Sequence, residues 1–285
     1  MLNSANENVY NYKVKLSIVS FNVFGAPFDP HRILWSLLKT RIATRLTKIS
    51  QILSEQNADV ILLQELHSYK HLNLMRKILK EYPFVIYKRY LFGPRGGLVV
   101  FSKLPLKQLE YVDFRKRGAY FNKSITGHIS KKGILLCKLD NYPVYLLNTH
   151  LTQNSDHDWS KSNRFTQYLL AQLQQLAEIV TFLTPSRNQI ILGGDLNMPK
   201  DSVFYKQFLS RSNLVDLFSD YSSSTYHNDY FPDRKLNIGR IDYIFASYGC
   251  KLRTKDQIFT KKFKQHDGKI SYLSDHKGLL ARITI

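Results

Sequence analysis

Eight side chains able to bind a cation or transfer a proton lie where short apolar segments of the chain begin or end. The segments SIVSFN, VILLQE, VYLLNTH and IILGG end in such residues or run directly into them, and the others lie within GRIDYIF or ahead of GLLARI. The eight are Asn22, Glu65, His150, Asp195, Asn197, Asp242, Asp275 and His276. A single Asp or Asn after a strand usually serves as a turn residue or helix cap, so the joint pattern carries the argument.

The chemistry of this set depends on whether the apolar segments are neighbouring strands. In open α/β sheets the carboxyl ends of adjacent strands share an edge, and ligands bind there. Four carboxylates at such an edge repel one another unless they bind a cation, share protons or pair with histidine. Carboxylate and amide oxygens favour Mg²⁺ or Mn²⁺, whereas Zn²⁺ favours His and Cys. The set therefore predicts a divalent-cation site.

The hydrophobic pattern predicts the elements that would position these residues. Alternating or continuous apolar runs predict strands at 15–22, 59–65, 84–88, 97–102, 106–114, 133–139, 143–149, 189–193, 240–247 and 278–284. Apolar residues at helical spacing predict helices at about 42–53, 69–80 and 163–183. Helices interspersed among many strands indicate an α/β (α+β) protein with two packed sheets flanked by helices.

The composition is that of a folded and strongly basic protein. Of 285 residues, 44% are hydrophobic and 13% aromatic, which excludes intrinsic disorder. The 41 Lys and Arg against 22 Asp and Glu give a net charge of +19, which favours an anionic partner: nucleic acid, an acidic membrane or a phosphorylated substrate. No repeat or linker interrupts the chain, so we expect one catalytic domain over 15–285 after a short segment 1–14, and a monomer.

Targeting signals are not recognisable in the sequence. Neither a Sec-type signal peptide nor an apolar run of about 18 residues is present. The cytoplasm is therefore the expected location, and export by a non-Sec route is the alternative. The two cysteines, Cys137 and Cys250, cannot form a disulfide framework, and Cys137 lies in a predicted buried strand.

The same segments resemble, in order, the motif set of the endonuclease/exonuclease/phosphatase superfamily. The six motifs are SFNVFG (20–25), LLQEL (62–66), NTHL (148–151), GGDLNMP (193–199), GRIDYIF (239–245) and LSDHKGLLA (273–281). The resemblance covers nearly the whole chain. It implies a four-layer α/β-β/α sandwich with two mainly antiparallel sheets flanked by helices, and metal-dependent hydrolysis of phosphoester bonds.

The resemblance also implies roles for the residues that would hold the metal and the attacking water. Glu65 would be the principal metal ligand, with Asn22 and Asp275 assisting at the metal or its waters. Asp195 would orient and deprotonate the attacking water. Asn197 would hydrogen-bond the phosphoryl oxygens.

Two histidines would contact the scissile phosphate by the same resemblance. His276, paired with Asp242, and His150 would stabilise the negative charge that develops there. A carboxylate beside His276 would raise the pKa of that imidazole and keep it protonated. Such a cation and a bound metal neutralise charge that grows in the transition state of an anionic phosphodiester.

Within the superfamily, the chain resembles the neutral sphingomyelinases, which release phosphocholine from a membrane lipid. FNVFGAP and PRGGLVVFSKLPL (94–106) carry this resemblance. That branch often opens the strand before NTHL with a Lys-Gly pair, and Lys132-Gly133 stands in that place, which makes Lys132 a candidate substrate-binding residue. The Asp that the branch carries five residues before that Lys is replaced by Gly127, followed by His128, so the Asp–Lys pair lacks its acid here.

Two other functions fit the same chain. A Mg²⁺-dependent endonuclease acting on DNA or RNA would use the same catalytic residues and hold phosphates on its basic surface. A catalytically silent basic module that binds nucleic acid or membrane is the third hypothesis, and the complete set of eight residues argues against it.

A phospholipid substrate would bring the protein into peripheral contact with a membrane. Basic residues are attracted to anionic lipid. The candidate insertion tips are Phe28 with Trp35, and Tyr230 with Phe231. GPRGG (93–97) lacks the Lys-Ser/Thr ending of a nucleotide-binding loop and is predicted to form a turn before a strand.

Overall fold

The computed structural model describes residues 14–25, 39–116, 131–154, 158–184, 188–231, 237–264, 268 and 270–285. Phe28, Trp35, Gly127 and His128 lie outside the described residues, as does the predicted N-terminal segment except for Val14.

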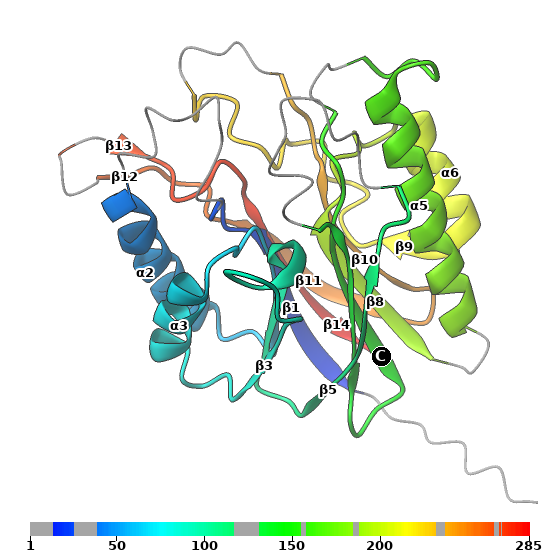
Figure 1. Cartoon of the computed structure of the whole chain (residues 1–285). Coiled ribbons are helices and arrows are strands. Elements are labelled where there is room, and N and C mark those ends of the chain that lie inside the picture. Colours follow the sequence, from blue (N-terminus) through cyan, green and yellow to red (C-terminus); the bar gives the residue numbers. More distant parts are fainter. Residues whose placement is uncertain are drawn as a thin grey trace, which may run out of the picture.

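Two six-stranded sheets form the central layers of the molecule (Figure 1). The first has the order β11-β14-β1-β2-β4-β3, built from β1 (Lys15–Asn22), β2 (Val60–Gln64), β3 (Phe84–Ile86), β4 (Val99–Ser102), β11 (Lys251–Ile258) and β14 (Gly278–Thr284). The second has the order β5-β6-β7-β8-β10-β9, built from β5 (Leu106–Asp113), β6 (Gly133–Leu139), β7 (Val144–His150), β8 (Gln189–Asp195), β9 (Leu214–Asp216) and β10 (Asp242–Ser247). The pairs β1–β2 and β7–β8 are parallel and the others are antiparallel, so the two sheets are mainly antiparallel, as predicted.

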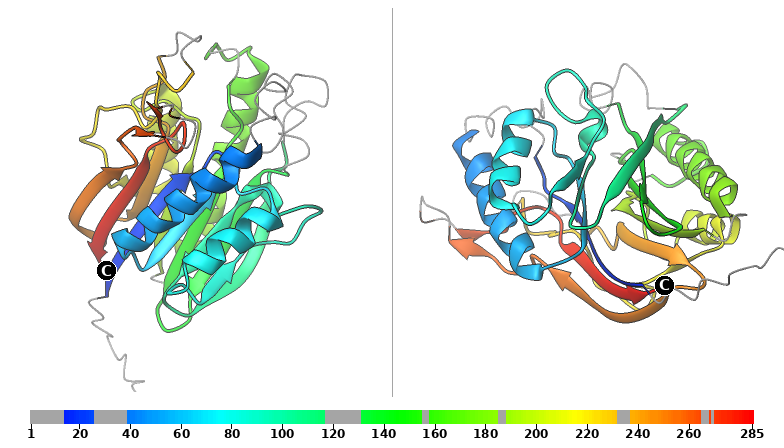
Figure 2. Two further views of the ribbon diagram at one scale, coloured as in Figure 1. Left: turned by 90° about the vertical axis from the view of Figure 1, so that its left-hand side faces the viewer. Right: turned by 90° about the horizontal axis from the view of Figure 1, so that it is seen from below.

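Two pairs of helices form the outer layers. The helices α2 (Lys39–Gln56) and α3 (Tyr69–Ile78) cover the first sheet, and α5 (Arg164–Leu183) and α6 (Val203–Ser212) cover the second (Figures 1 and 2). A short hairpin of β12 (Phe263–Lys264) and β13 (Ile270–Ser271) stands apart from both sheets. The four-layer sandwich predicted from the motifs is confirmed.

Alternation along the strands produces three separate cores. In β1, Leu16 and Ile18 point between the sheets, whereas Val19 and Phe21 point toward α2 and α3. A third buried cluster joins the second sheet to α5 and α6. Because side chains alternate between the faces of a strand, the central strands are apolar on both faces, which explains their continuous hydrophobic runs.

Several elements were not predicted. The helix α6, the short strand β9 and the edge strand β11 were absent from the expected set. The strand β11 was missed because it is largely exposed and its Lys-rich sequence resembles a solvated loop.

The proposed insertion tip at Tyr230 and Phe231 is wrong: Phe231 is only 7% exposed and packs edge-on against Phe24 and Tyr230. No helix in the described part of the chain has the length and apolar character to cross a bilayer.

A buried ion pair joins β9 to the segment that leads into β10. Asp216 accepts hydrogen bonds from Arg240 at 2.5 and 3.3 Å and from the Tyr205 hydroxyl at 2.8 Å, and the Arg240 side chain is fully buried. Removing the carboxylate with Asp216→Ala leaves a buried guanidinium unpaired, so we expect the free energy of unfolding to fall by about 3–5 kcal/mol in urea titrations. The exposed partner of Lys255, Asp220, provides the control, and Asp220→Ala should leave the urea midpoint close to that of the unaltered chain.

Candidate active site

The eight predicted residues meet at one end of the sandwich, where the two sheets pack together. Asn22 ends β1 and Glu65 directly follows β2, both in the first sheet. His150 and Asp195 are paired across β7 and β8 of the second sheet, and Asp195 is also paired with Asp242 of β10. The residues therefore come from both sheets, and the site lies at the junction of the two.

Three of the residues enter the site from the amino ends of strands, as the position of Asp275 and His276 ahead of GLLARI suggests. Asp242 is the first residue of β10, and Asp275 and His276 precede β14. β10 runs antiparallel to β8, and β14 runs antiparallel to β1. The amino ends of these two strands therefore lie at the same end of the sandwich as the carboxyl ends of their neighbours.

The amide of Asn22 connects carboxylates of the two sheets. Its Nδ2 donates to Glu65 Oε1 at 3.2 Å and to Asp195 Oδ2 at 3.1 Å, while its Oδ1 accepts from the backbone N–H of Phe24 at 3.0 Å. Asn22 is completely buried, so this geometry is held by the surrounding core. The amide orients both carboxylates, and its predicted assisting role at a metal stays a prediction.

Glu65 is held by an unusual backbone conformation. Its φ is +63°, in the left-handed region, and the next residue, Leu66, donates its N–H to Gly97 O at 2.9 Å. Gly97 has φ +68°, and a Cβ there would lie 2.9 Å from the Cα of Glu65, so glycine is required for this approach. Gly97 ends the short helical turn η2 (Arg95–Gly97), which agrees with the turn predicted for GPRGG before a strand.

His276 forms an ion pair with Asp242 and faces Asp195. Its Nδ1 lies 2.9 Å from Asp242 Oδ2, and its Nε2 lies 3.7 Å from Asp195 Oδ2. Burial alone would lower the pKa of His276, but the carboxylates of Asp242 and Asp195 outweigh it and raise that pKa well above its usual value. The imidazole is therefore a buried cation with both N–H groups available as donors.

Asp195 has two oxygens with different surroundings. Oδ1 accepts from the backbone N–H of Asn197 at 2.9 Å, while Oδ2 faces Asn22, His276 and, at 3.4 Å, His150. Burial raises the pKa of Asp195 to about 7, with the nearby His276 charge opposing this shift. Asn197 adopts φ +49° and donates its side-chain Nδ2 to Leu151 O at 3.1 Å, which fixes the turn after β8.

Lys132 lies inside the site and contacts His150. Its Nζ is 2.9 Å from His150 Nε2 and donates to Leu151 O at 2.6 Å. Burial, followed by the charge of Lys132, lowers the pKa of His150 well below its usual value, so His150 is neutral and accepts this hydrogen bond. Burial also lowers the pKa of Lys132 to about 8, against the attraction of Asp195 and Glu65.

Comparison with models of known protein families shows which family the chain belongs to. The model of the Endonuclease/Exonuclease/phosphatase family matches residues 19–276. The chain belongs to this family. The membership predicted from the six motifs is therefore confirmed.

Relatives and solved structures with the same fold are known. Human sphingomyelin phosphodiesterase 2 is 25% identical over 297 residues, which cover 96% of this chain and 66% of the relative. The crystal structure of sphingomyelinase C from Streptomyces griseocarneus superposes with a TM-score of 0.68 at 18% identity, covering 94% of this chain and 99% of that one. Truncated TDP2 from Caenorhabditis elegans gives 0.67 at 19% identity, with 95% and 98% covered. The chain spans just under two thirds of the length of the human relative.

The donors at the junction suit the divalent cation on which members of the Endonuclease/Exonuclease/phosphatase family depend. Atoms of Asp195, Asp242 and His276 lie within 4.8 Å of one another, but a protonated imidazole has no lone pair to offer a metal. We therefore regard these three as an ion-pair network. The half-buried carboxylate of Glu65, oriented by Asn22, and the buried Oδ1 of Asp242, which has no hydrogen-bond partner, fit a cation that prefers oxygen.

Three further residues at or beneath the site were not predicted from the sequence. His67 is a third imidazole near Glu65 and Lys132, and burial lowers its pKa. Gln64 and Asn148 lie beneath the site on β2 and β7, and Gln64 Nε2 donates to Asn148 Oδ1 at 2.8 Å. The available signal was an amide inside each of two otherwise apolar strands, VILLQ and VYLLNTH.

The bridge between Gln64 and Asn148 provides a test of how the two sheets are held together. Asn148 also donates to Leu63 O at 2.9 Å and Val99 O at 3.1 Å, so Asn148→Ala leaves several buried groups unpaired. We expect the free energy of unfolding to fall by about 2–4 kcal/mol, measured by denaturant titration. The exposed Gln167 is the control, and Gln167→Ala should change stability by less than about 0.5 kcal/mol.

Proposed function

We propose that the chain is a divalent-metal-dependent phosphodiesterase that hydrolyses a phospholipid of the sphingomyelin type. The observation that carries the proposal is the arrangement around Asp195 Oδ2, which faces a buried cationic imidazole, a neutral imidazole and an amide that also holds Glu65. A base, a cation and an oriented metal-binding carboxylate are the groups that phosphodiester hydrolysis requires.

The metal would be held by Glu65, with Asn22 and Asp275 assisting, and Mg²⁺ or Mn²⁺ suits these donors. When bound, the ion would supply positive charge to the phosphoryl oxygens. Asp195 is placed to accept a proton from water, because its pKa of about 7 matches the working pH of a general base.

Charge at the phosphate would be balanced by His276 and Lys132. His276 offers Nε2–H toward the space beside Asp195, and Asp242 keeps that proton on the ring. His150 is neutral in this arrangement, so we assign it and Lys132 together to substrate binding, with Lys132 Nζ as the shared donor. Asn197, whose backbone fixes Asp195, completes the set.

A lipid is favoured over nucleic acid by the distribution of basic residues. Two segments of the sequence, 103–138 and 251–264, are rich in Lys and Arg, and they contain β5 and β11, respectively. β5 and β11 are edge strands of different sheets, and because β3 packs near β5 and β14 near β10, they lie at opposite sides of the sandwich. These two strands therefore do not form one continuous basic track, although an endonuclease remains the alternative that the substrate assay separates.

The test uses purified protein and three substrates. With Mg²⁺ present, the protein should hydrolyse bis-p-nitrophenyl phosphate, and EDTA should abolish the reaction. Parallel assays on sphingomyelin liposomes and plasmid DNA then assign the substrate class. Hydrolysis of DNA alone would contradict the lipid assignment, and activity that survives EDTA would contradict the metal requirement.

A further inference from the structure

The connection between β3 and β4 carries two adjacent, exposed apolar side chains. Leu91 is 66% exposed and Phe92 is 83% exposed. Among the residues that the structure describes, no other two sequence neighbours are both large, apolar and exposed. The connection projects from the sandwich in both views of Figure 2, and we call its residues 90–93 the tip. Adjacent apolar side chains held in water at a projecting tip are typical of a contact surface.

Hydrogen bonds to the backbone hold this tip in place. The hydroxyl of Tyr69, at the start of α3, donates to Tyr90 O at 2.7 Å and accepts from Tyr90 N at 3.0 Å. Tyr69 N donates to Phe92 O at 3.1 Å, and Arg95 N donates to Lys88 O at 2.8 Å. The exposure of the two apolar side chains is therefore a fixed property of the fold.

Positive charge surrounds the tip. Lys88 and Arg89 immediately precede it and are exposed, and Lys70 is exposed near the start of α3. The stretch 66–109 contains nine Lys and Arg and one acidic residue, Glu81. Apolar side chains flanked by basic ones match the interface of a phospholipid bilayer, where acyl chains lie below anionic head groups.

The tip adjoins the catalytic end of the sandwich. A Cβ at Gly93 would lie 2.1 Å from His67 O, so the tip packs directly on the segment that follows Glu65. Gly97 accepts the N–H of Leu66 from the other end of the same connection. A surface met by Leu91 and Phe92 would thus lie beside the residues that we assign to metal binding.

We propose that Leu91 and Phe92 insert into the interface of a phospholipid membrane while Lys88 and Arg89 bind anionic head groups. The inference rests on the proposed function, because a lipid hydrolase must work at a membrane surface. The insertion holds the catalytic end against the lipid. It assigns to this tip the membrane contact that the sequence had suggested for Tyr230 and Phe231.

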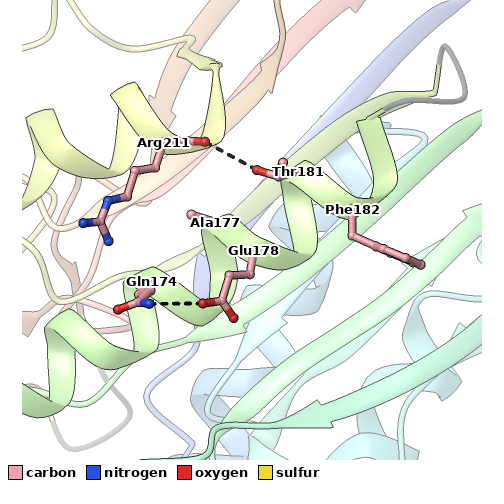
Figure 3. A pocket seen from close by; sticks show the side chains of 6 residues that line it. All are labelled: Gln174, Ala177, Glu178, Thr181, Phe182 and Arg211. Atoms are coloured by element: carbon pink, nitrogen blue, oxygen red, sulfur yellow. Dashed lines mark hydrogen bonds between the residues drawn. The ribbon is translucent and has the colours of Figure 1, made fainter.

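A matched control lies on the opposite helical layer. Phe182 of α5 is 83% exposed, as Phe92 is, and borders a hollow of about 450 Å³ (Figure 3). The hollow is lined by Gln174, Ala177, Glu178, Thr181, Phe182 and Arg211. In Figure 3, the Phe182 ring points away from Gln174 and Arg211. Removing this ring changes exposed apolar area without touching the tip.

The experiment compares the double variant Leu91→Ser/Phe92→Ser with Phe182→Ser. In flotation assays with vesicles of phosphatidylcholine and phosphatidylserine, the double variant should bind at least about tenfold more weakly than the unaltered chain. Phe182→Ser should bind normally. Both should hydrolyse soluble bis-p-nitrophenyl phosphate at the unaltered rate, because no replaced side chain belongs to the catalytic set.

A gain of signal complements this loss. Phe92→Trp should show a blue shift of its fluorescence when the vesicles are added, because the indole enters an apolar environment. Phe182→Trp should show none.

The outcomes separate this inference from the proposed function. If the chain hydrolyses no phosphodiester but binds vesicles through the tip, the proposed function fails and the membrane contact stands. If vesicles are not bound, or the double variant binds them normally, the membrane contact is overturned whatever the activity. Self-association that the double variant abolishes, without vesicle binding, would also overturn it and assign the tip to a second copy of the chain.

Discussion

Replacing His276 with alanine is expected to lower kcat for bis-p-nitrophenyl phosphate by about 10²–10³-fold, the usual cost of removing a donor that stabilises charge developing in the transition state. The structure gives two reasons for a loss in this range. The variant removes a buried cation aimed at the reacting groups, and it leaves Asp242 and Asp195 close together without the charge between them. Steady-state kinetics at saturating Mg²⁺ would measure the loss.

The control for this variant is His71→Ala, which removes a partly buried imidazole on α3 that has no place in the proposed mechanism. Circular dichroism and thermal unfolding should show both variants folded. A kcat for His276→Ala within about tenfold of the unaltered value would contradict the role assigned to the imidazolium.

Replacing Glu65 with glutamine should weaken metal binding as its main effect. The substitution keeps the side-chain shape and removes the negative charge of the principal proposed ligand. Because substitutions of outer-shell partners alone cost roughly 10- to 100-fold in metal affinity or activity, we expect the Mg²⁺ concentration for half-maximal activity to rise by at least about 100-fold. Activity measured over a series of Mg²⁺ concentrations gives this value directly.

Isothermal titration calorimetry with Mn²⁺ provides a readout for Glu65→Gln that is independent of turnover. Glu178→Gln is the matched control, since Glu178 is an exposed carboxylate of α5 on the opposite helical layer. Unchanged metal binding in Glu65→Gln would contradict the assignment of Glu65 as the principal ligand and show that the cation is held elsewhere.

The sequence predicted which polar residues meet at the junction of the sheets, because each one lies at or near the end of an apolar strand. Asn22, Glu65 and His150 stand where a hydrophobic run stops, so polarity marked them. The sequence alone did not reveal that the strands of Asp242 and His276 run antiparallel to their neighbours, because strand direction depends on long-range pairing.

Other features depended on contacts that no local pattern contains. The Lys132–His150 hydrogen bond joins the residue just before β6 to the last residue of β7, and burial determines which partner carries the proton. Gln64 and Asn148 lie far apart in sequence and meet only when the two sheets pack. The pair Leu91 and Phe92 was not singled out in the sequence, because exposure is a property of the folded chain.

The position of β14 has a consequence for synthesis of the protein on the ribosome. This strand lies between β1 and β11, and Ser274, just before it, donates to Asn22 O at 2.7 Å across 252 residues. At about 5–20 residues per second, β1 is made roughly ten to fifty seconds before its neighbour. During that time one edge of β1 has no partner strand, and an open edge invites pairing with other chains. The yield of folded protein should therefore depend on chaperones that cover nascent chains more than on the stability of the finished fold.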